Sequence, residues 1–322
     1  MSDTFEIEDP CLVFALELDN SGGASPLLSL SAENPHWLHL DYSYSNASDV
    51  LQHIGIPETV VAALIRPDTR PRTLAFPEGT LVFLRGINFN PGDDPEDMVS
   101  IRMWIEANRL VTVRQRKLLS AQDIRADLES GLGPHSIEHL ITQLISRIAD
   151  RVSTFVEGLD ERLSQLEEGF AENIDSSARS QISAIRRQAA EVRRYLAPQK
   201  EALDGLYRNI ASMSRHDFAN ELREQADRNT RYIEELDLLR ERAMVLNEEL
   251  QNLVAQEQNN RMYVLSIVSI IFLPITFVSG VFGMNVAGLP GVTNVSSFWI
   301  VAASMLVVSL AVIVGLKIKK WF

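Results

Sequence analysis

The stretch Met262-Tyr-Val-Leu-Ser-Ile-Val-Ser-Ile-Ile-Phe-Leu-Pro-Ile-Thr-Phe-Val-Ser-Gly-Val-Phe282 has no charged residue and ends at Gly283-Met284-Asn285. At about 1.5 Å of rise per residue, a helix of this length crosses a hydrocarbon core of about 30 Å. A buried helix of a soluble core is the alternative for a single run of this kind. A second uncharged run, 298–316, follows closely, and two in tandem favour a pair of membrane-spanning helices.

The charges beside the two runs predict their orientation. Arg261 precedes the first run, three lysines follow the second, and the connection 283–297 has no ionisable residue. Since loops rich in Lys and Arg stay in the cytoplasm, we expect both termini to be cytoplasmic and the connection to face outward. Trp299 and Trp321 suit the two interfaces, where an indole ring keeps its N–H in contact with water.

The remainder of the chain is acidic. All 43 acidic residues precede the first run, against 27 of the 30 Lys and Arg, so this part carries a net charge of −16. Such a field concentrates cations and disfavours nucleic acid as a partner. The single cysteine, Cys11, excludes a disulfide framework or a thiolate zinc site within one chain, and the acidic N-terminus lacks the apolar core of a cleavable signal peptide.

Residues 1–133 show short β-type runs between turn signals and brief helical patterns, which predicts an α/β domain. The helices are expected at 47–54, with Asn46 as the cap, and at 58–65 after Pro57. No glycine-rich phosphate loop or Ser/His/Asp signature stands out, so we do not expect an enzyme. The expected strands are 12–18, 37–42, 73–76, 80–87, 99–106 and 110–114.

Residues 134–261 favour helix throughout. Helices are expected at 136–170 and 176–209, the second kinked or broken at Pro198, which lacks an N–H donor and clashes one turn back. The third, 218–282, would be about 100 Å long. Its leucine-rich positions alternate steps of three and four, which predicts a coiled-coil seam that needs partners. The seam comprises Leu236, Leu239, Ala243, Leu246, Leu250 and Leu253.

A second face of the same helix is unusually polar for a membrane span. Its register runs through Glu241, Val245, Glu248, Asn252, Ala255 and Asn259, and then through Met262, Ser266, Ser269, Leu273, Thr276 and Gly280. If several copies surround an axis with this face inward, they enclose a water-accessible tube. The alternative for any single Ser or Thr is a hydrogen bond to the preceding turn or to a neighbouring helix.

The triplet Gly283-Met284-Asn285 stands at the outer end of the first of two C-terminal spans, after a long stalk and before a lysine tail. In that position it resembles the CorA family of divalent-cation transporters, over nearly the full chain. The resemblance implies an α+β membrane protein: an N-terminal α/β cytosolic domain, a long helical stalk, two transmembrane helices and a funnel-shaped homopentamer. The domains would be 1–133, 134–261, 262–282, 283–297, 298–316 and a basic tail 317–322.

When the pore positions of the family are transferred to this sequence by aligning the Gly-Met-Asn triplet, Gly283, Met284 and Asn285 fall at the periplasmic mouth. Asn285 would contact the hydrated cation transiently. The family alignment also implicates Thr276, Leu273, Leu265, Met262 and Glu248; periodicity selects all of these except Leu265, where it prefers Ser266. The loop after the triplet has no acidic residue, and its Gly-Leu-Pro-Gly sequence, the segment 194–198 and the tail look like the zinc-transporting branch of the family.

The resulting hypothesis is zinc transport across a bacterial inner membrane, as uptake, with proton coupling left open because neither span holds an Asp, Glu, His, Lys or Arg. A magnesium or broad divalent-cation channel is the alternative within transport, and a membrane-anchored coiled-coil scaffold the alternative outside it. No resident cofactor is expected. Two histidine pairs, His36 with His39 and His135 with His139, have two interpretations. Each pair is either a regulatory metal site or a pair of ordinary surface or core histidines.

Overall fold

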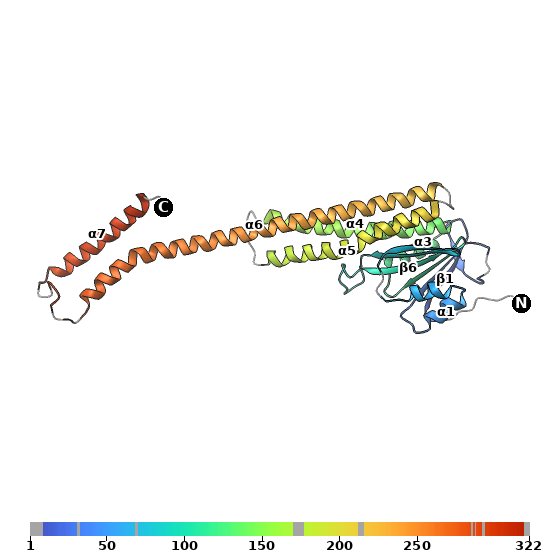
Figure 1. Cartoon of the computed structure of the whole chain (residues 1–322), viewed down its shortest axis with the longest axis horizontal. Helices are drawn as coiled ribbons and strands as arrows, with labels where there is room; N and C mark the ends of the chain where they lie inside the picture. Colours follow the sequence, from blue (N-terminus) through green and yellow to red (C-terminus); the bar gives the residue numbers. More distant parts are fainter. Residues whose placement is uncertain are drawn as a thin grey trace. The chain divides into compact units, whose positions relative to one another are not determined.

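The computed structural model describes residues 9–30, 33–67, 70–169, 177–211, 216–284, 286, 288–291 and 294–318 (Figure 1). The chain divides into two compact units, Met1–Asn247 and Glu248–Phe322. The first contains one sheet and most of the helices. The second contains the end of the long helix α6 and the helix α7.

The N-terminal unit is built on a seven-stranded sheet in the order β2-β1-β3-β7-β6-β5-β4. Strands β3 and β7 pair in parallel, and the other neighbours are antiparallel. The strands are β1 Leu12–Leu18, β2 Ala24–Pro26, β3 His36–Asp41, β4 Arg72–Phe76, β5 Gly79–Gly86, β6 Val99–Ile105 and β7 Arg109–Arg114.

Alternating side chains of the central strands pack into two separate cores, one on each face of the sheet. Leu81 and Phe83 of β5 lie in the core covered by the short helices α1 (Ala47–His53) and α2 (Glu58–Leu64). Val82 and Leu84 lie in the larger core with α3 (Leu119–Glu129) and the long helices. The sheet is therefore buried on both faces, which fixes the register of its strands.

Three long helices form a bundle beside the sheet: α4 (Ile137–Gly169), α5 (Ala178–Ala211) and the first part of α6 (His216–Phe282). The predicted seam of α6 is buried from Leu236 to Leu250 within this single chain, whereas Leu253 is 39% exposed. Ion pairs join the helices, with Arg228 2.6 Å from Asp150, Arg242 2.6 Å from Glu167 and Arg193 2.6 Å from Asp237. The partners that the seam needs are thus α4 and α5 of the same chain.

The structure confirms the six expected strands and the six expected helices to within two residues where their ends are described. Asn46 occupies the cap position of α1 but makes no side-chain capping bond. Its backbone has φ −90° and ψ 3°, outside the extended conformation usual for a cap, and its amide nitrogen donates to Asp9 Oδ2 at 2.6 Å. The expected break at Pro198 was wrong, because α5 continues through the proline and is packed in the bundle on both sides of it by the buried Val192, Leu196 and Ala202; a kink there stays a prediction.

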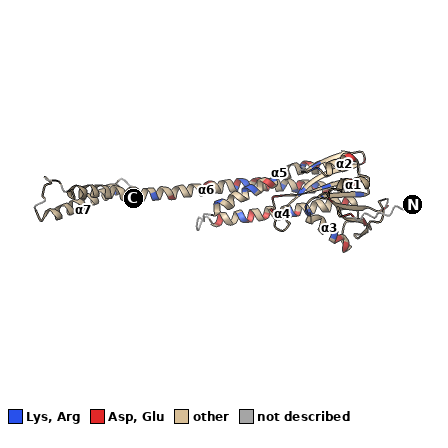
Figure 2. Cartoon of the chain, turned by 90° about the horizontal axis from the view of Figure 1, so that it is seen from below, with Lys and Arg blue, Asp and Glu red and all other residues tan. Residues whose placement is uncertain are grey.

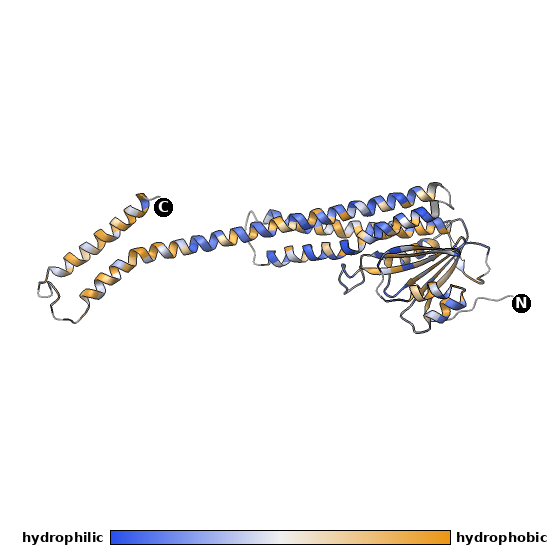
Figure 3. Ribbon diagram, viewed as in Figure 1, coloured by the Kyte–Doolittle hydropathy of each residue, from blue (hydrophilic) through white to orange (hydrophobic). Residues whose placement is uncertain are grey.

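The C-terminal unit holds two helices long and apolar enough to cross a membrane, α6 toward its end at Phe282 and α7 (Ser297–Ile318). Within the most apolar window of each, only 6% and 0% of residues are buried inside the chain. Figure 3 shows the apolar colour predominating on α7 and on the end of α6, and Figure 2 shows most of the charged residues in other parts of the chain. Lipid or other copies must therefore cover these surfaces.

Candidate functional site

One side of α6 in the C-terminal unit is less exposed than the rest. Ile267 is 8% exposed, and the other partly shielded residues follow at helical spacing. They are Ile271, Pro274, Ile275, Val278 and Val281, and α7 has a matching set at Val301, Met305, Ser309, Val312 and Leu316. This is the pattern of a helical hairpin in which one face of each helix turns toward the other.

The predicted pore stripe lies on the opposite side of α6. At about 100° of rotation per residue, the positions Met262, Ser269, Leu273, Thr276 and Gly280 centre about 200° from the shielded face. All five are exposed in the single chain. The hairpin thus leaves the stripe uncovered, as a surface that faces an axis between copies must be.

Leu265 and Ser266 cannot be separated by this geometry. Each lies about 50° from the middle of the stripe, on opposite sides of it. Both are exposed, Leu265 at 61%. The disagreement between the family alignment and the periodicity therefore persists in the structure.

The serine hydroxyls of the stripe are bonded within their own helix. Ser266 Oγ donates to the carbonyl of Met262 at 2.8 Å, and Ser269 Oγ donates to that of Leu265 at 2.9 Å. This back-bonding was the simpler reading of such residues. It also commits the hydroxyl proton, so each Oγ can offer only lone pairs to a third group, which suits a cation or its water shell and not an anion.

The C-terminal end of the stripe coincides with the end of α6. After Phe282 the Gly283 N–H bonds the carbonyl of Ser279 at 2.9 Å, and a Cβ on Gly283 would lie 3.1 Å from that oxygen. Glycine is therefore used here for close approach to the last turn. The C-terminus of a helix carries a partial negative charge that favours cations. Met284 is exposed, and Asn285 lies outside the described residues.

The N-terminal end of the stripe reaches Glu248, an exposed carboxylate. Between Glu248 and the apolar part, Glu257 pairs with Arg261 at 2.5 Å, so these charges largely cancel. From Met262 to Phe282 the helix carries no charge. The stripe can thus attract cations at its ends and can weakly solvate them between.

The histidine pairs of the N-terminal unit contact neighbouring residues of the fold. His39 is wholly buried, stacks on Phe14 and contacts Thr112 Oγ1 at 2.7 Å, and burial lowers the pKa of His39 to about 3. His139 Nδ1 accepts from the backbone of His135 at 3.3 Å. Among the described residues, no cluster of three or more His, Cys, Asp or Glu could hold a metal ion. Burial also raises the pKa of the Cys11 thiol to about 11.

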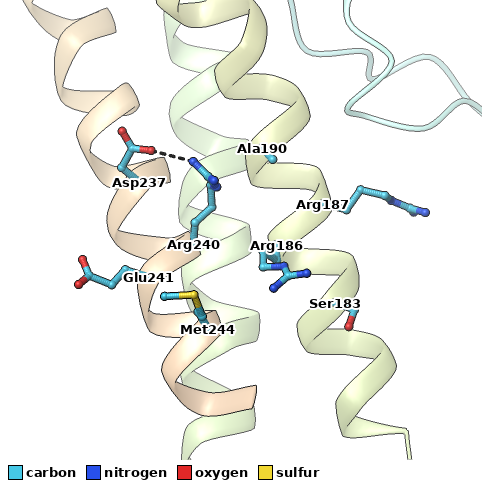
Figure 4. Close-up of a pocket in the computed structure, with 8 residues that line it drawn as sticks. All are labelled: Ser183, Arg186, Arg187, Ala190, Asp237, Arg240, Glu241 and Met244. Carbon is cyan, nitrogen blue, oxygen red and sulfur yellow. Dashed lines mark hydrogen bonds and ion pairs between the residues drawn. The ribbon is translucent and has the colours of Figure 1, made fainter. Parts of the chain in front are cut away.

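A groove of about 610 Å³ lies between α5 and α6 in the N-terminal unit (Figure 4). Its lining mixes cations and carboxylates, and Arg240 pairs with Asp237 at 3.2 Å. Figure 4 shows the Arg187 side chain pointing away from α6. The lining residues are Ser183, Arg186, Arg187, Ala190, Asp237, Arg240, Glu241 and Met244. With guanidinium groups beside its two carboxylates, this groove does not suit a metal ion.

Known proteins match this arrangement over nearly the whole chain. The family model described as CorA-like Mg²⁺ transporter protein matches residues 32–320. The zinc transport protein ZntB of Yersinia enterocolitica is 34% identical over 96% of this chain and 95% of its own. The divalent cation transporter CmaX of Pseudomonas aeruginosa is 37% identical over 90% of each chain.

Solved structures agree with these matches. The structure of full-length CmaX has a TM-score of 0.84 at 35% identity, and the alignment covers 97% of this chain and 100% of that one. The CorA magnesium transporter of Methanocaldococcus jannaschii has a TM-score of 0.82 at 18% identity, covering 96% and 99%. The second likeness concerns the fold alone.

Proposed function

The chain belongs to the CorA-like family of transporters, and from this premise we propose that it carries zinc and related divalent cations across a bacterial inner membrane. The transporting form is a homo-oligomer, with five copies as the resemblance to the family implies. Both termini face the cytoplasm, and the connection between α6 and α7 faces outward. Its relatives are named as transporters, in line with the expectation that the chain is not an enzyme.

The observation that carries the proposal is the stripe on α6. Its small and hydroxylated residues stand about opposite the face shielded in the hairpin, and every described member from Glu248 to Gly280 is exposed in the single chain. Lipid tails offer no polar partner to a row of hydroxyl oxygen atoms, so a lipid-facing surface does not explain why these residues are aligned. Copies arranged with this face inward enclose a wet path.

The chemistry of the path suits a hydrated divalent ion. Hydroxyl oxygens of Ser269 and Thr276 and the amide of Asn285 are neutral oxygen groups, which exchange rapidly with a water shell. Tight zinc sites favour Cys and His, and neither occurs between Met262 and Ile318. A path without tight sites releases its ion, so passage is fast, and Leu273 and Met262 supply the apolar constrictions that gate it.

The membrane potential is sufficient to drive uptake. A divalent ion gains about 4.6 kcal/mol per 100 mV of inside-negative potential. At about 1.4 kcal/mol per decade, this sustains more than a thousandfold accumulation. Because neither span contains Asp, Glu, His, Lys or Arg, we propose that flux follows the potential, and coupling to protons would have to involve groups such as Glu248 or Glu257.

The test is zinc flux into proteoliposomes under an imposed potential, with and without a pH gradient. Ser269→Leu and Thr276→Leu place apolar bulk on the stripe and are expected to reduce flux at least tenfold. Ser279→Leu is the matched control: Ser279 also bonds its own helix, donating to Thr276 at 3.0 Å, but it lies about 90° from the stripe. Equal effects of the three changes, or undiminished flux in Asn285→Ala, would contradict the proposed path.

A broader divalent-cation channel is the second candidate, favoured by the similarity to CmaX. Competition separates the two, because magnesium in excess should suppress zinc entry only if the path does not discriminate. The scaffold hypothesis predicts no flux in any variant. It is retained only if the purified oligomer fails to transport every divalent ion supplied.

A further inference from the structure

Within the bundle, α6 leaves one of its faces uncovered. Toward α5, Asp237 pairs with Arg193 at 2.6 Å, and toward α4, Arg242 pairs with Glu167 at 2.6 Å. At about 100° per residue, Asp237 and Arg242 stand about 140° apart around the helix, and the buried seam lies on the longer arc between them. The shorter arc is exposed in the single chain. Its residues are Glu234, Leu238, Glu241 and Val245.

This open face fixes the sides on which neighbouring copies must lie. Glu241 and Val245 belong to the stripe that turns toward an axis between copies. The direction of that axis comes from the proposed function, on which the interface described below therefore rests. Around such an axis, one neighbour lies on the α5 side of α6 and the other on its α4 side. A closed ring of identical chains then joins unlike surfaces, the α5 side of one copy with the α4 side of the next.

The α5 side carries the groove between α5 and α6, and positive charge is in excess there. Of its three arginines, Arg240 pairs with Asp237 at 3.2 Å, and Arg187 lies 3.8 Å from a carboxylate of the loop before β6. Arg186 is exposed, and no ion pair or hydrogen bond reaches it from the part of the chain that the structure describes. Figure 4 shows Glu241, the second carboxylate of the groove, pointing away from α5. The groove can therefore accept a carboxylate from outside the chain.

The α4 side carries an excess of negative charge. Glu157 and Glu161 of α4 and Glu235 of α6 are exposed there, and among the described residues no ion pair reaches any of the three. Burial raises the pKa of Glu235, Arg231 lowers it, and the negative charges of Glu157 and Asp160 raise it further. The side chains of α4 and α6 thus repel one another here. We call Glu157, Glu161 and Glu235 the acidic flank.

The groove and the acidic flank lie at the same height along α6. Arg186 and Glu241 both line the groove, which places Arg186 near the level of Glu241. Glu161 follows Asp160, which pairs with Arg242, so Glu161 lies near the level of Arg242. These two levels differ by one residue, a rise of about 1.5 Å. Because cyclic symmetry keeps every copy of a residue at one height along the axis, Arg186 of one copy can meet Glu161 of the next.

We propose that the groove between α5 and α6 of one copy binds the acidic flank of the next copy, with Arg186 contacting Glu161. Opposite charges then face each other across every contact of the ring, which favours this arrangement over others. The same contact covers two apolar side chains of the open face, Leu238 at 56% and Val245 at 49% exposed. Both stand toward its α4 side, about 100° and 80° from Asp237. The groove volume of about 610 Å³ admits several side chains.

The experiment is cross-linking between full-length chains that carry either Arg186→Cys or Glu161→Cys, co-expressed with different tags and reconstituted in lipid. Because unlike surfaces meet, a short bismaleimide should join unlike chains at least about tenfold faster than like chains, as the facing thiols have a high effective concentration. Leu132→Cys in place of Glu161→Cys is the control, since Leu132 is 79% exposed but belongs to neither surface. The native Cys11 is buried, so the background is low.

Charge reversal supplies an independent readout. Arg186→Glu and Glu161→Arg each place like charges across the contact, and each should raise the dissociation constant of the oligomer about tenfold on dilution, as measured by mass photometry. The double variant restores the attraction and should return to within about threefold of the unchanged protein. Arg125→Glu is the matched control, because Arg125 is also an exposed helical arginine but lies on α3, outside both surfaces.

The outcomes separate the interface from the proposed transport. An intact, ion-conducting oligomer without cross-links between unlike chains would overturn the interface alone, as would charge reversals whose effects simply add in the double variant. Cross-linked rings that carry no divalent cation would support the interface and overturn transport. A protein that is monomeric in lipid would overturn both.

Discussion

Replacing Thr112 by valine tests the hydrogen-bonded centre of the sheet. Thr112 is fully buried on β7, and its Oγ1 accepts from Trp37 Nε1 at 2.8 Å. The same oxygen donates its proton to the carbonyl of Leu38 at 3.2 Å and lies 2.7 Å from His39 Nδ1. Because its proton goes to Leu38, the threonine accepts from His39, whose neutral ring is therefore protonated at Nδ1.

The expected loss of stability follows from the two N–H donors, of Trp37 and His39, that remain without an acceptor. Valine has nearly the shape of threonine, so packing changes little, but the Trp37 and His39 N–H groups lose their acceptor where water cannot replace it. A buried unsatisfied donor costs about 1–3 kcal/mol. The free energy of unfolding of the N-terminal unit should fall by about 2–6 kcal/mol. Thr112→Ser keeps the hydroxyl and loses one methyl, so it should cost only about 1 kcal/mol.

The measurement is urea unfolding of the full-length protein in detergent at pH 7.5, followed by tryptophan fluorescence and by hydrogen exchange of peptides spanning 36–41 and 109–114. Thr154→Val is the surface control, since Thr154 bonds only the carbonyl of Asp150 in its own helix and should change stability by less than about 0.5 kcal/mol. If serine proved more damaging than valine at position 112, packing and not hydrogen bonding would govern this site.

Three further predictions concern pH, the bundle and the stripe. Because the pKa of His39 is about 3 in the folded protein and about 6.5 when unfolded, its contribution to stability is complete above pH 6.5 and falls by about 1.4 kcal/mol per pH unit toward pH 3; His39→Gln should flatten this part of the unfolding profile. Leu239→Ala should cost about 2–5 kcal/mol, whereas the adjacent, 56% exposed Leu238→Ala should cost less than about 0.5, both read from urea unfolding. In the assembled protein, Ser266→Cys should react faster than Leu265→Cys with a charged thiol reagent, and the reverse order would support the family alignment; the background is low because the native Cys11 is buried.

The sequence was informative where periodicity and burial agree. The central strands β3, β5, β6 and β7 are rich in β-branched and apolar residues, and their alternate side chains pack on the two cores. The elements that were not predicted are the three-residue β2, which is too short to show alternation, and α3, whose start Leu118 makes no side-chain cap. The missing capping bond of Asn46 could not be predicted, because it depends on the backbone conformation at the cap, and the contact of its amide nitrogen with Asp9 joins residues 37 positions apart.

The spacing of residues along α6 predicts the stripe. It does not predict that α7 packs on the opposite side of α6, because the sequence of α7 is apolar throughout and shows no periodic face. The burial of Arg102 was missed for a different reason. A single arginine in a strand usually marks a position exposed to solvent, but β6 lies inside the sheet and both of its faces are buried. The flanking Ile101 and Met103 are the signal that could have indicated it.

The spacing of the stripe decides how the helices of an oligomer must wind. With Ser266, steps of four and three continue unbroken from Glu241 to Gly280. A straight helix drifts about 20° per seven residues, so over this length the stripe would turn by about 110° away from a fixed axis. Only a left-handed supercoil keeps it inward. With Leu265, the steps from Met262 to Leu273 become three, four and four, which cover the same interval, so the required winding is unchanged and only the side of the stripe differs. Reactivity at these two positions therefore measures which side of the stripe faces the axis at this level of the helix.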